Sequence, residues 1–250
     1  MKQLIIIGAG KGAELVLKWV ERFNEYEYRV WSEIWGPFPR GAGFTPDLIT
    51  PVGILDDCED RHGQEIMEVP IIGATNYLKR QECLCGQADC LANTRLPKYH
   101  LICSSSNVPF RKKIAAMYSG KYPFLNSIRS ELADDIKIGE GNIIFPGVST
   151  DWFTEIGSHN VMSTGCAIAH HNKIGDCNLF GPGCMFSGSV TIGSGCRFGS
   201  LIVVEPCVTI GDDCNIASGS VIVGDVPSGT SIKAIRNTGQ PIYQGERRVR

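Results

Sequence analysis

Two groups of residues in this 250-residue chain have the types and spacing for chemistry. The first is a glycine-rich turn that follows the apolar run Leu4–Ile7 and contains Gly8, Gly10, Lys11 and Gly12. Glycines at the start of a helix let backbone N–H groups approach a phosphate. The second group is the histidines, whose side chains suit a general base because their pKa lies near neutrality. They are His62, His100, His159, His170 and His171.

The glycine turn reads G-x-G-x-G rather than the G-x-G-x-x-G of dinucleotide sites, so a dinucleotide cofactor is not favoured. Asp56 and Asp57 follow the apolar run Val52–Leu55, where carboxylates commonly accept hydrogen bonds from a ribose or a base. A third run, His100–Cys103, leads into the polar turn Ser104–Asn107 and then a helix. The order predicts a small parallel sheet. The same residues also fit an ordinary strand, turn and helix, with the Asp pair as a turn or helix cap.

The second half of the chain repeats with a period of six residues. Stepping by six from Ile138 to Ile222 gives fifteen positions, and all of them except Thr150 are apolar. Because six is neither the 3.6-residue period of a helix nor the alternation of a strand, the chain must turn once per repeat. Glycine recurs every eighteen residues, so three repeats make one coil, and about five coils stack on one another. These glycines are Gly139, Gly157, Gly175, Gly193 and Gly211.

A second ladder of small and amide-bearing residues stands four positions after each apolar rung. Its cysteines are expected to be packing residues. The recurring glycine indicates a backbone conformation or a close approach that a Cβ would hinder. The chain has eleven cysteines, an odd number, so we expect reduced thiols in a reducing compartment. Cys83, Cys85 and Cys90 lie close together but lack a clear fourth ligand, so we expect no metal site.

Composition and charge argue against several classes of partner. Hydrophobic residues make up 43% of the chain and charged residues 20%, and the formal net charge is -2. Because no long run of one charge sign occurs, we expect no nucleic-acid partner. No apolar stretch approaches the roughly 18 residues that a membrane span needs, and Leu4–Ile7 is too short for a signal-peptide core. We therefore expect a cytoplasmic protein without membrane insertion.

The repeat half resembles the hexapeptide-repeat acyltransferase superfamily at the runs Lys173–Asp176, Thr191–Gly193 and Val208–Asp213. Together with the glycine turn and the Asp pair, the resemblance extends over nearly the whole chain. It is to the sugar acetyltransferase branch that includes the bacillosamine-pathway N-acetyltransferase and the sialic-acid O-acetyltransferase of capsule synthesis. It implies a left-handed β-helix, a homotrimer with active sites between neighbouring prisms, and acetyl-CoA as the acyl donor. The residues implied to hold a nucleotide-linked sugar are Gly8, Gly10, Lys11, Gly12, Asp56, Asp57 and Asn107.

Acyl transfer from a thioester needs a base for the acceptor's proton and a donor for the developing oxyanion. The resemblance assigns the base to His170, and it assigns the backbone N–H that meets the thioester carbonyl of coenzyme A to Gly188. His171 occupies the position of the acidic residue that usually orients the base, so the base should be weaker unless Asp151, Glu155 or another acid reaches it from the adjacent prism. Ser163 occupies a position often filled by asparagine. The family's closing G-x-P-A-K segment is absent, and residues 233–238 stand in its place.

We expect a small Rossmann-like α/β domain that binds a nucleotide sugar at residues 1–127, an all-β left-handed β-helix at 128–226, and a tail at 227–250. The segments at about Trp31–Thr50 and Gln81–Pro97 are expected to be longer loops than is usual, and His62 and His159 to lie on the surface. The expected reaction is N-acetylation of a nucleotide-linked amino sugar, with His170, His171 and Gly188 at the catalytic site. Two alternatives stay open: O-acetylation of a sugar hydroxyl, and a non-catalytic trimer that binds a nucleotide sugar.

Overall fold

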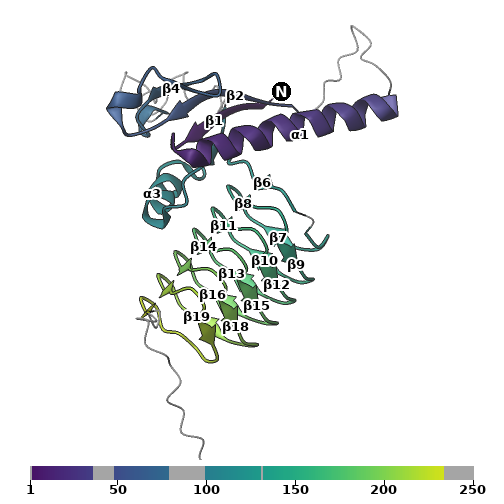
Figure 1. Cartoon of the computed structure of the whole chain (residues 1–250), viewed down its shortest axis with the longest axis vertical. Helices are drawn as coiled ribbons and strands as arrows, with labels where there is room; N and C mark the ends of the chain where they lie inside the picture. Colours follow the sequence, from purple (N-terminus) through teal and green to yellow (C-terminus); the bar gives the residue numbers. More distant parts are fainter. Residues whose placement is uncertain (1, 36–47, 79–98, 131, 234–250) are drawn as a thin grey trace, which may run out of the picture.

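The computed structural model describes residues 2–35, 48–78, 99–130 and 132–233. Figure 1 shows a small sheet with its helices above a stack of short strands that coils away from it. Cys83, Cys85, Cys90 and the expected loop at Gln81–Pro97 lie outside the described residues, as does nearly all of the segment that replaces the closing family motif.

The N-terminal sheet contains five strands in the order β3-β4-β2-β1-β5. Four of them are parallel to their neighbours, and the edge strand β3 pairs antiparallel with β4. The three apolar runs predicted as strands are confirmed, whereas the β3–β4 hairpin was not predicted. The strands are β1 (Lys2–Ile7), β2 (Ile49–Leu55), β3 (Glu65–Ile66), β4 (Val69–Gly73) and β5 (Tyr99–Cys103).

Helices cover both faces of this sheet. The helix α1 (Lys11–Trp35) packs on the face that carries Leu4 and Ile6, and α3 (Val108–Tyr118) packs on the face that carries Ile5 and Ile7. Because successive strand residues point to opposite faces, β1 is buried on both sides, as its unbroken apolar run indicates. A short 3₁₀ helix, η1 (Glu59–Arg61), follows β2. The expected loop at Trp31–Thr50 is therefore shorter, since α1 continues to Trp35 and β2 begins at Ile49.

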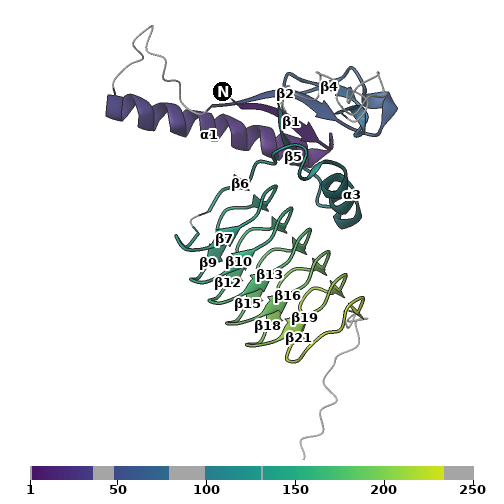
Figure 2. The same ribbon diagram turned by 180° about the vertical axis from the view of Figure 1, so that it is seen from behind.

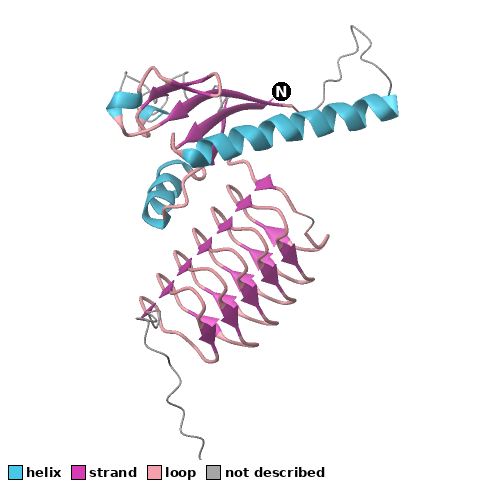
Figure 3. Cartoon of the chain, viewed as in Figure 1, coloured by secondary structure: helices cyan, strands magenta, loops and turns pink. Residues whose placement is uncertain are grey.

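The second half is a parallel β-helix of two-residue strands, which form three faces of a prism (Figures 2 and 3). Its left-handed sense stays a prediction from the resemblance. The β7 face contains β7 (Lys137–Ile138), β10 (Glu155–Ile156), β13 (Lys173–Ile174), β16 (Thr191–Ile192) and β19 (Thr209–Ile210). The β8 face contains β6 (Ser127–Ile128), β8 (Ile143–Ile144), β11 (Val161–Met162), β14 (Leu179–Phe180), β17 (Arg197–Phe198), β20 (Asn215–Ile216) and β22 (Ser231–Ile232). The β9 face contains β9 (Ser149–Thr150), β12 (Ala167–Ile168), β15 (Met185–Phe186), β18 (Val203–Val204) and β21 (Val221–Ile222).

The β8 face is longer than the expected stack of about five coils. Two faces have five strands each, but the β8 face has seven, because β6 precedes the first coil and β22 follows the last one. Backbone hydrogen bonds join these end strands to the sheet, with Ser127 N–H donating to the Asn142 carbonyl and Asn215 N–H to the Thr230 carbonyl, both at 2.9 Å. The β22 strand thus lies within the segment expected to be a tail. The domain boundaries at 127 and 226 stay a prediction.

The predicted apolar ladder fills the centre of the prism. The second residue of each strand points inward, and each inner residue sits on its counterpart eighteen residues further on. Phe180 and Phe198 stack with their ring centroids 4.9 Å apart, and Phe186 meets both rings edge-on. Thr150, the one polar rung, lies in the first coil, where its hydroxyl accepts a hydrogen bond from the N–H of Ala133.

The second ladder contributes hydrogen bonds as well as packing. The Cys184 thiol donates to the Gly199 carbonyl of the next coil, and the Asn178 amide donates to the Gly193 carbonyl in the same way. Cys196 makes the equivalent bond, and burial raises the pKa of its thiol to about 12, so it stays a donor. The recurring glycines reflect close approach between coils. A Cβ on Gly175, for example, would lie 2.8 Å from the carbonyl carbon of Gly193.

Candidate functional site

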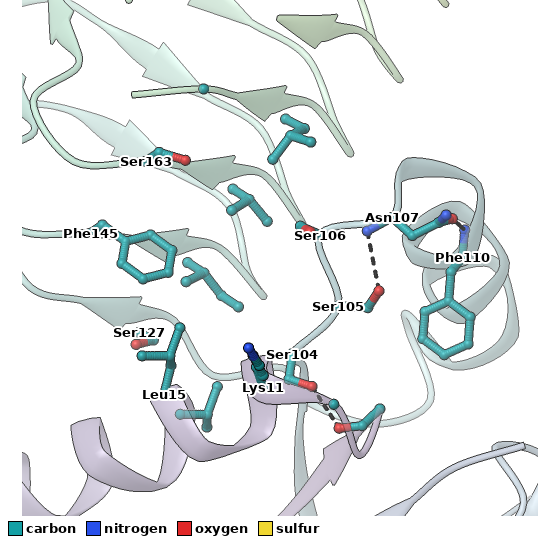
Figure 4. Close-up of a pocket in the computed structure, with 18 of the residues that line it drawn as sticks. Lys11, Leu15, Ser104, Ser105, Ser106, Asn107, Phe110, Ser127, Phe145 and Ser163 are labelled. Carbon is teal, nitrogen blue, oxygen red and sulfur yellow. Dashed lines mark hydrogen bonds between the residues drawn. The ribbon is translucent and has the colours of Figure 1, made fainter. Parts of the chain in front are cut away.

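A cavity of about 1100 Å³ lies between the N-terminal sheet and the β8 face of the β-helix. Figure 4 shows Lys11 and Leu15 of α1 on one side of it and Phe145 and Ser163 of the β-helix on the other. Its wall on the β-helix side includes Ile143, Val161, Leu179 and Arg197, the outward residues of four successive strands. Six of the seven residues expected to hold a nucleotide sugar line this cavity, and Asp57 is the exception.

Each of the three glycines in the first turn lacks a side chain for a different reason. Gly8 has a φ of +104°, which favours glycine. A Cβ on Gly12 would lie 2.1 Å from the Ser104 carbonyl oxygen, so glycine there permits close packing of α1 on that turn. A Cβ on Gly10 would meet nothing within 4 Å, and Gly10 lines the cavity. The protein's own packing therefore does not account for the missing side chain at Gly10, whereas a ligand that approaches the backbone would account for it.

Asp56 holds the glycine turn in place. Its two carboxylate oxygens accept hydrogen bonds from the N–H of Ala9 at 2.7 Å and the N–H of Cys58 at 2.9 Å. Arg61 donates to the Ala9 carbonyl at 3.3 Å from the other side. The carboxylate at the end of β2 is therefore part of the wall that shapes the turn.

The carboxylate of Asp57 faces away from this wall. It accepts hydrogen bonds from the N–H and hydroxyl of Thr75 and pairs with Lys113 at 3.1 Å. Burial acts to raise the pKa of Asp57, but the bonds from Thr75 and Lys113 outweigh it and lower the pKa below its ordinary value. Asp57 thus joins the end of β2 to α3, and the structure does not bring it into the cavity.

The third turn, Ser104–Asn107, lines the cavity and begins a helix. Asn107 is the N-cap of α3, because its side chain accepts a hydrogen bond from the N–H of Phe110 at 2.9 Å. Ser104 is buried, and its hydroxyl donates to the Gly8 carbonyl at 2.7 Å, which ties this turn to the glycine turn.

Cationic side chains outnumber acidic ones around the cavity. Lys11, Arg61, Arg129 and Arg197 line it, and Asp56 is the one carboxylate among its lining residues. An excess of positive charge in a partly enclosed cleft favours an anionic ligand. Lys11 was expected here from the sequence, whereas the three arginines were not. The position of Arg197 in the repeat could have predicted its place in the cavity. It is the outward residue of β17 and lies in the same row as Ile143, Val161 and Leu179.

The second part of the expected site is the corner of the prism between the β9 and β7 faces. A Cβ on Gly188 would lie 2.6 Å from Cε1, 2.9 Å from Nε2 and 3.2 Å from Nδ1 of His170, so the Cε1 edge of the imidazole lies against Gly188 with Nε2 as the nearer nitrogen. The Nδ1 atom also faces His171, with the two Nδ1 atoms 3.0 Å apart. Among the described residues, no hydrogen bond involves the N–H of Gly188. The structure thus brings together the three residues expected at the catalytic centre, His170, His171 and Gly188.

This corner and the large cavity occupy different parts of one chain. The chain passes from the β8 face to the β9 face and then to the β7 face in each coil. The cavity borders the β8 face and the corner that follows it, at Gly181 and Gly199, whereas His170 lies at the next corner. The β9 face therefore separates the two. A shallower recess of about 440 Å³ lies along that face beside the histidine corner and is lined by Asp151, Ala169 and Ser187, among others.

Arg111 joins the N-terminal domain to the β-helix. Its guanidinium is fully buried and donates to four backbone carbonyls within 3.0 Å. Two of these carbonyls belong to the N-terminal domain, that of Cys103 at the end of β5 and that of Ser105 in the turn that lines the cavity, and two, of Gly141 and His159, belong to the β-helix. The guanidinium therefore fixes the position of the third turn relative to the β-helix.

His159, expected on the surface, is buried in this junction. Its Nε2 hydrogen-bonds the Ser119 hydroxyl at 2.8 Å, and its ring meets Phe124 edge-on. Burial, aided by the charge of Arg111, lowers the pKa of His159 to about 4. His62 is exposed, as expected.

The buried His159 is expected to make folding pH-dependent. Because its pKa is about 4 in the folded chain and 6.5 when unperturbed, the unfolded chain binds the proton more tightly. The free energy of unfolding should therefore decrease as the pH falls below 6.5, by up to about 3 kcal/mol once the pH is below 4. Urea unfolding between pH 7 and pH 4 measures this slope. The variant His159→Asn removes the titrating group, and an unchanged slope in that variant would contradict the assignment.

No group of three or more metal-ligating side chains gathers anywhere in the described ranges. Within the same ranges, no helix has the length and apolar character to span a membrane. The eight cysteines that the structure describes are all free.

A repeat family and several solved structures resemble this chain. The family model described as bacterial transferase hexapeptide (six repeats) matches residues 189–224. The acetyltransferase domain of PglB from Neisseria gonorrhoeae FA1090 superposes with a TM-score of 0.68 at 19% identity, covering 92% of this chain and 96% of that one. The same domain has been solved in complex with acetyl coenzyme A. No curated protein sequence matches the chain.

Two further structures share the fold. A perosamine N-acetyltransferase from Caulobacter crescentus, in complex with CoA and GDP-perosamine, superposes with a TM-score of 0.66 at 21% identity, over 92% of this chain and 93% of that one. WeeI from Acinetobacter baumannii AYE gives 0.51 at 17% identity, over 92% and 96%. At these identities the likeness shows the fold alone. The expected hexapeptide repeat is confirmed at residues 189–224, and the chain shares the fold of these acetyltransferase structures.

Proposed function

We propose that this hexapeptide-repeat protein transfers an acetyl group from acetyl-CoA to the amino group of a nucleotide-linked amino sugar. The observation that carries the proposal is the placement of an imidazole edge of His170 against Gly188, whose N–H is bonded to no described residue. A base next to an available N–H donor is the pair that acyl transfer requires. The shared fold with N-acetyltransferases supports the same reaction class.

The reaction needs no covalent intermediate on the protein. The amine nitrogen of the sugar attacks the carbonyl carbon of the thioester, and the Gly188 N–H stabilises the negative charge that develops on the carbonyl oxygen. His170 Nε2 accepts a proton from the amine, the C–S bond breaks, and the leaving thiolate takes that proton from the imidazolium. The products are the sugar acetamide and free coenzyme A.

The large cavity is proposed to hold the nucleotide-linked sugar. Its four cationic side chains suit a diphosphate, and the open backbone at Gly10 lies at the start of α1, where N–H groups bind phosphate. In this account the N-terminal sheet is the Rossmann-like nucleotide domain expected from the sequence. Asp56 would act mainly by holding the glycine turn.

The proposed active site is completed by a second copy of the chain. Within one chain the β9 face separates the cavity from His170, so packing three β9 faces around one axis would bring the histidine corner of one copy toward the cavity edge of the next. That face carries exposed apolar side chains, including Met185 and Val221, and Leu201 and Val223 lie at its corners. Apolar patches of this kind mark contact surfaces. We therefore propose a closed homotrimer with three shared sites, in which packed copies would cover these side chains.

A large side chain at Gly10 is expected to block the sugar site and leave the fold intact. A Cβ there meets nothing within 4 Å, so Gly10→Trp should unfold at the same urea concentration as wild type while filling the cavity next to the glycine turn. Binding of nucleotide sugars should weaken by about 5-fold to 100-fold, since overpacking costs about 1–3 kcal/mol. Calorimetric titration with the nucleotide sugar and separately with acetyl-CoA measures both affinities. Loss of acetyl-CoA affinity as well would show that the cavity holds the donor instead.

The reaction itself is tested by incubating the protein with acetyl-CoA and a panel of nucleotide-linked 3- and 4-amino sugars, and by identifying the product by mass spectrometry and NMR. An acetamide on one sugar supports the proposal. An alkali-labile ester on a sugar without a free amine would identify the O-acetylation that the same fold and base permit.

The non-catalytic alternative makes a different prediction. A binding protein whose donor cleft has decayed would be stabilised by a nucleotide sugar but not by acetyl-CoA. An enzyme should be stabilised by both, by about 2.7 kcal/mol for a ligand at 100 times its dissociation constant. The replacement of the usual acid by His171 is the observation that keeps this alternative open.

The proposal places the reaction in the cytoplasm, which agrees with the free cysteines.

A further inference from the structure

The pair of neighbouring histidines has a geometry that assigns a proton to each ring. The two Nδ1 atoms lie 3.0 Å apart, and the ring planes are nearly perpendicular, at 86°. A hydrogen bond between two imidazole nitrogens needs one donor and one acceptor, so the Nδ1 atoms must differ in protonation. The tautomer of one ring therefore fixes the tautomer of the other.

The ring of His171 is held by the preceding coil. Its centroid lies 4.8 Å from that of Phe153, and its backbone N–H donates to the Trp152 carbonyl at 3.1 Å. Its φ is +59°, a conformation that non-glycine residues seldom adopt and that Asn and Asp tolerate best. These contacts keep the Nδ1 atom of His171 directed at His170.

No carboxylate replaces the missing acid in the part of the chain that the structure describes. The titratable groups of the same corner on neighbouring coils are Asp134, Asp135, Asp151, Glu205 and Cys207. Asp151 and Asp135 accept hydrogen bonds from the N–H groups of Trp152 and Phe153. None of these five side chains hydrogen-bonds either imidazole, so His171 is the one described partner of the His170 ring.

We propose that His171 is the positioning residue that makes His170 a base, by accepting the Nδ1 proton of His170 on its own Nδ1. This assignment rests on the proposed function and names the device that replaces the carboxylate. With its proton on Nδ1, His170 has a bare Nε2 on the edge that lies against Gly188. That atom takes the proton of the attacking amine and returns it to the leaving thiolate, while the bond to His171 keeps the ring from turning. A neutral acceptor orients the base without adding negative charge.

The arrangement separates two roles that a carboxylate combines. A carboxylate both orients an imidazole and stabilises its protonated form, which raises the pKa of the base. A neutral imidazole supplies orientation alone. A carboxylate at position 171 should therefore keep the enzyme active and move the acid limb of its pH profile to higher pH, whereas a side chain without an acceptor should lose orientation.

Four proteins test this assignment: wild type, His171→Asn, His171→Asp and His171→Phe. The first two replacements supply an acceptor oxygen and tolerate the positive φ, whereas phenylalanine preserves the contact with Phe153 but has no acceptor. His171→Phe should lose at least about 10-fold in kcat with KM nearly unchanged, as is typical when the partner that orients a histidine is removed. His171→Asn should recover most of that loss. As the pH is lowered, the rate of His171→Asp should begin to fall at a higher pH than the rate of wild type.

The protonation of the pair is read without any turnover, by ¹⁵N NMR of histidine-labelled protein at pH 8. The expected spectrum has a protonated Nδ1 and a bare Nε2 on His170, and the opposite tautomer on His171. A bare Nδ1 on His170 would overturn the assignment, as would a His171→Phe enzyme with wild-type kcat. If wild type acetylates no sugar, the proposed function fails, and the NMR spectrum still decides how the pair shares its proton.

Discussion

Replacing His170 with alanine is expected to lower the rate of thiol release from acetyl-CoA by about 10²-fold or more, the usual effect of losing a general base. The side chain is exposed at a corner of the β-helix, so the variant should unfold at the same urea concentration as wild type. Affinity for the nucleotide sugar should change little, because the proposed contacts to its diphosphate come from the cationic side chains and the glycine turn of the cavity and not from His170.

The measurement is a thiol-release assay with wild type, His170→Ala and the matched control Lys173→Ala. Lys173 is exposed on the outward side of β13, three residues after His170, and makes no contact with the proposed site. The control should retain wild-type activity. If His170→Ala retained more than a tenth of the wild-type rate, His170 would not be the base.

Replacing Arg111 with methionine is expected to cost about 3–5 kcal/mol in the free energy of unfolding. Methionine fills a similar volume but leaves four buried carbonyls without their donor, and an unsatisfied buried polar group costs about 1–3 kcal/mol. The total for the four carbonyls is reduced because the structure relaxes and admits water. The expected cost then falls in the range that is typical when a buried charge network is broken. Arg111→Lys should cost less, since it preserves one charge but not the planar fork that reaches four acceptors.

Urea unfolding of both variants beside Lys113→Met gives the comparison. Lys113 lies next to Arg111 on α3, and its exposed pair with Asp57 should contribute no more than about 1 kcal/mol. If Arg111→Met were no less stable than Lys113→Met, the two parts of the chain would be held together by other contacts, principally the apolar cluster that includes Ile143 and Val161.

The β-helix and its histidine corner could be predicted because a periodic fold converts sequence spacing into position. His170 and Gly188 are eighteen residues apart, which is one coil, so the period alone puts them at the same corner on adjacent coils. The same holds for the glycines, whose close approach to the next coil repeats at each turn. The strands of the N-terminal sheet could be predicted because each is an uninterrupted apolar run.

The junction between the two parts could not be predicted, because its contacts follow no period. Arg111 binds carbonyls that are 6 to 48 residues away in the sequence, and nothing in its neighbourhood marks it as buried. Burial of His159 follows from the same junction. The sequence did contain a sign that the β8 face is covered. The outward residues of this face include Ile143, Val161 and Leu179, and such a row of apolar side chains indicates burial. Asp57 was expected beside Asp56 in the same site, but it lies outside the cavity because neighbouring residues at a strand end point in different directions.

The most direct test of the central claim is to mix two chains that are each defective in one half of the site, at a nucleotide-sugar concentration too low for Gly10→Trp to bind the sugar. The claim is that acetyl transfer occurs where the cavity of one chain meets His170 of another. Gly10→Trp and His170→Ala damage different halves of that site, so a trimer that contains both chains can assemble an intact cavity opposite an intact base. Random mixing in equal amounts should make about a quarter of the sites fully wild type. The cavity is intact in half of the chains and His170 is intact in the other half, so both parts of a site are intact about one time in four. Thiol release near a quarter of the wild-type rate is the predicted result. If the mixture released thiol no faster than its two components alone, the shared site would be contradicted.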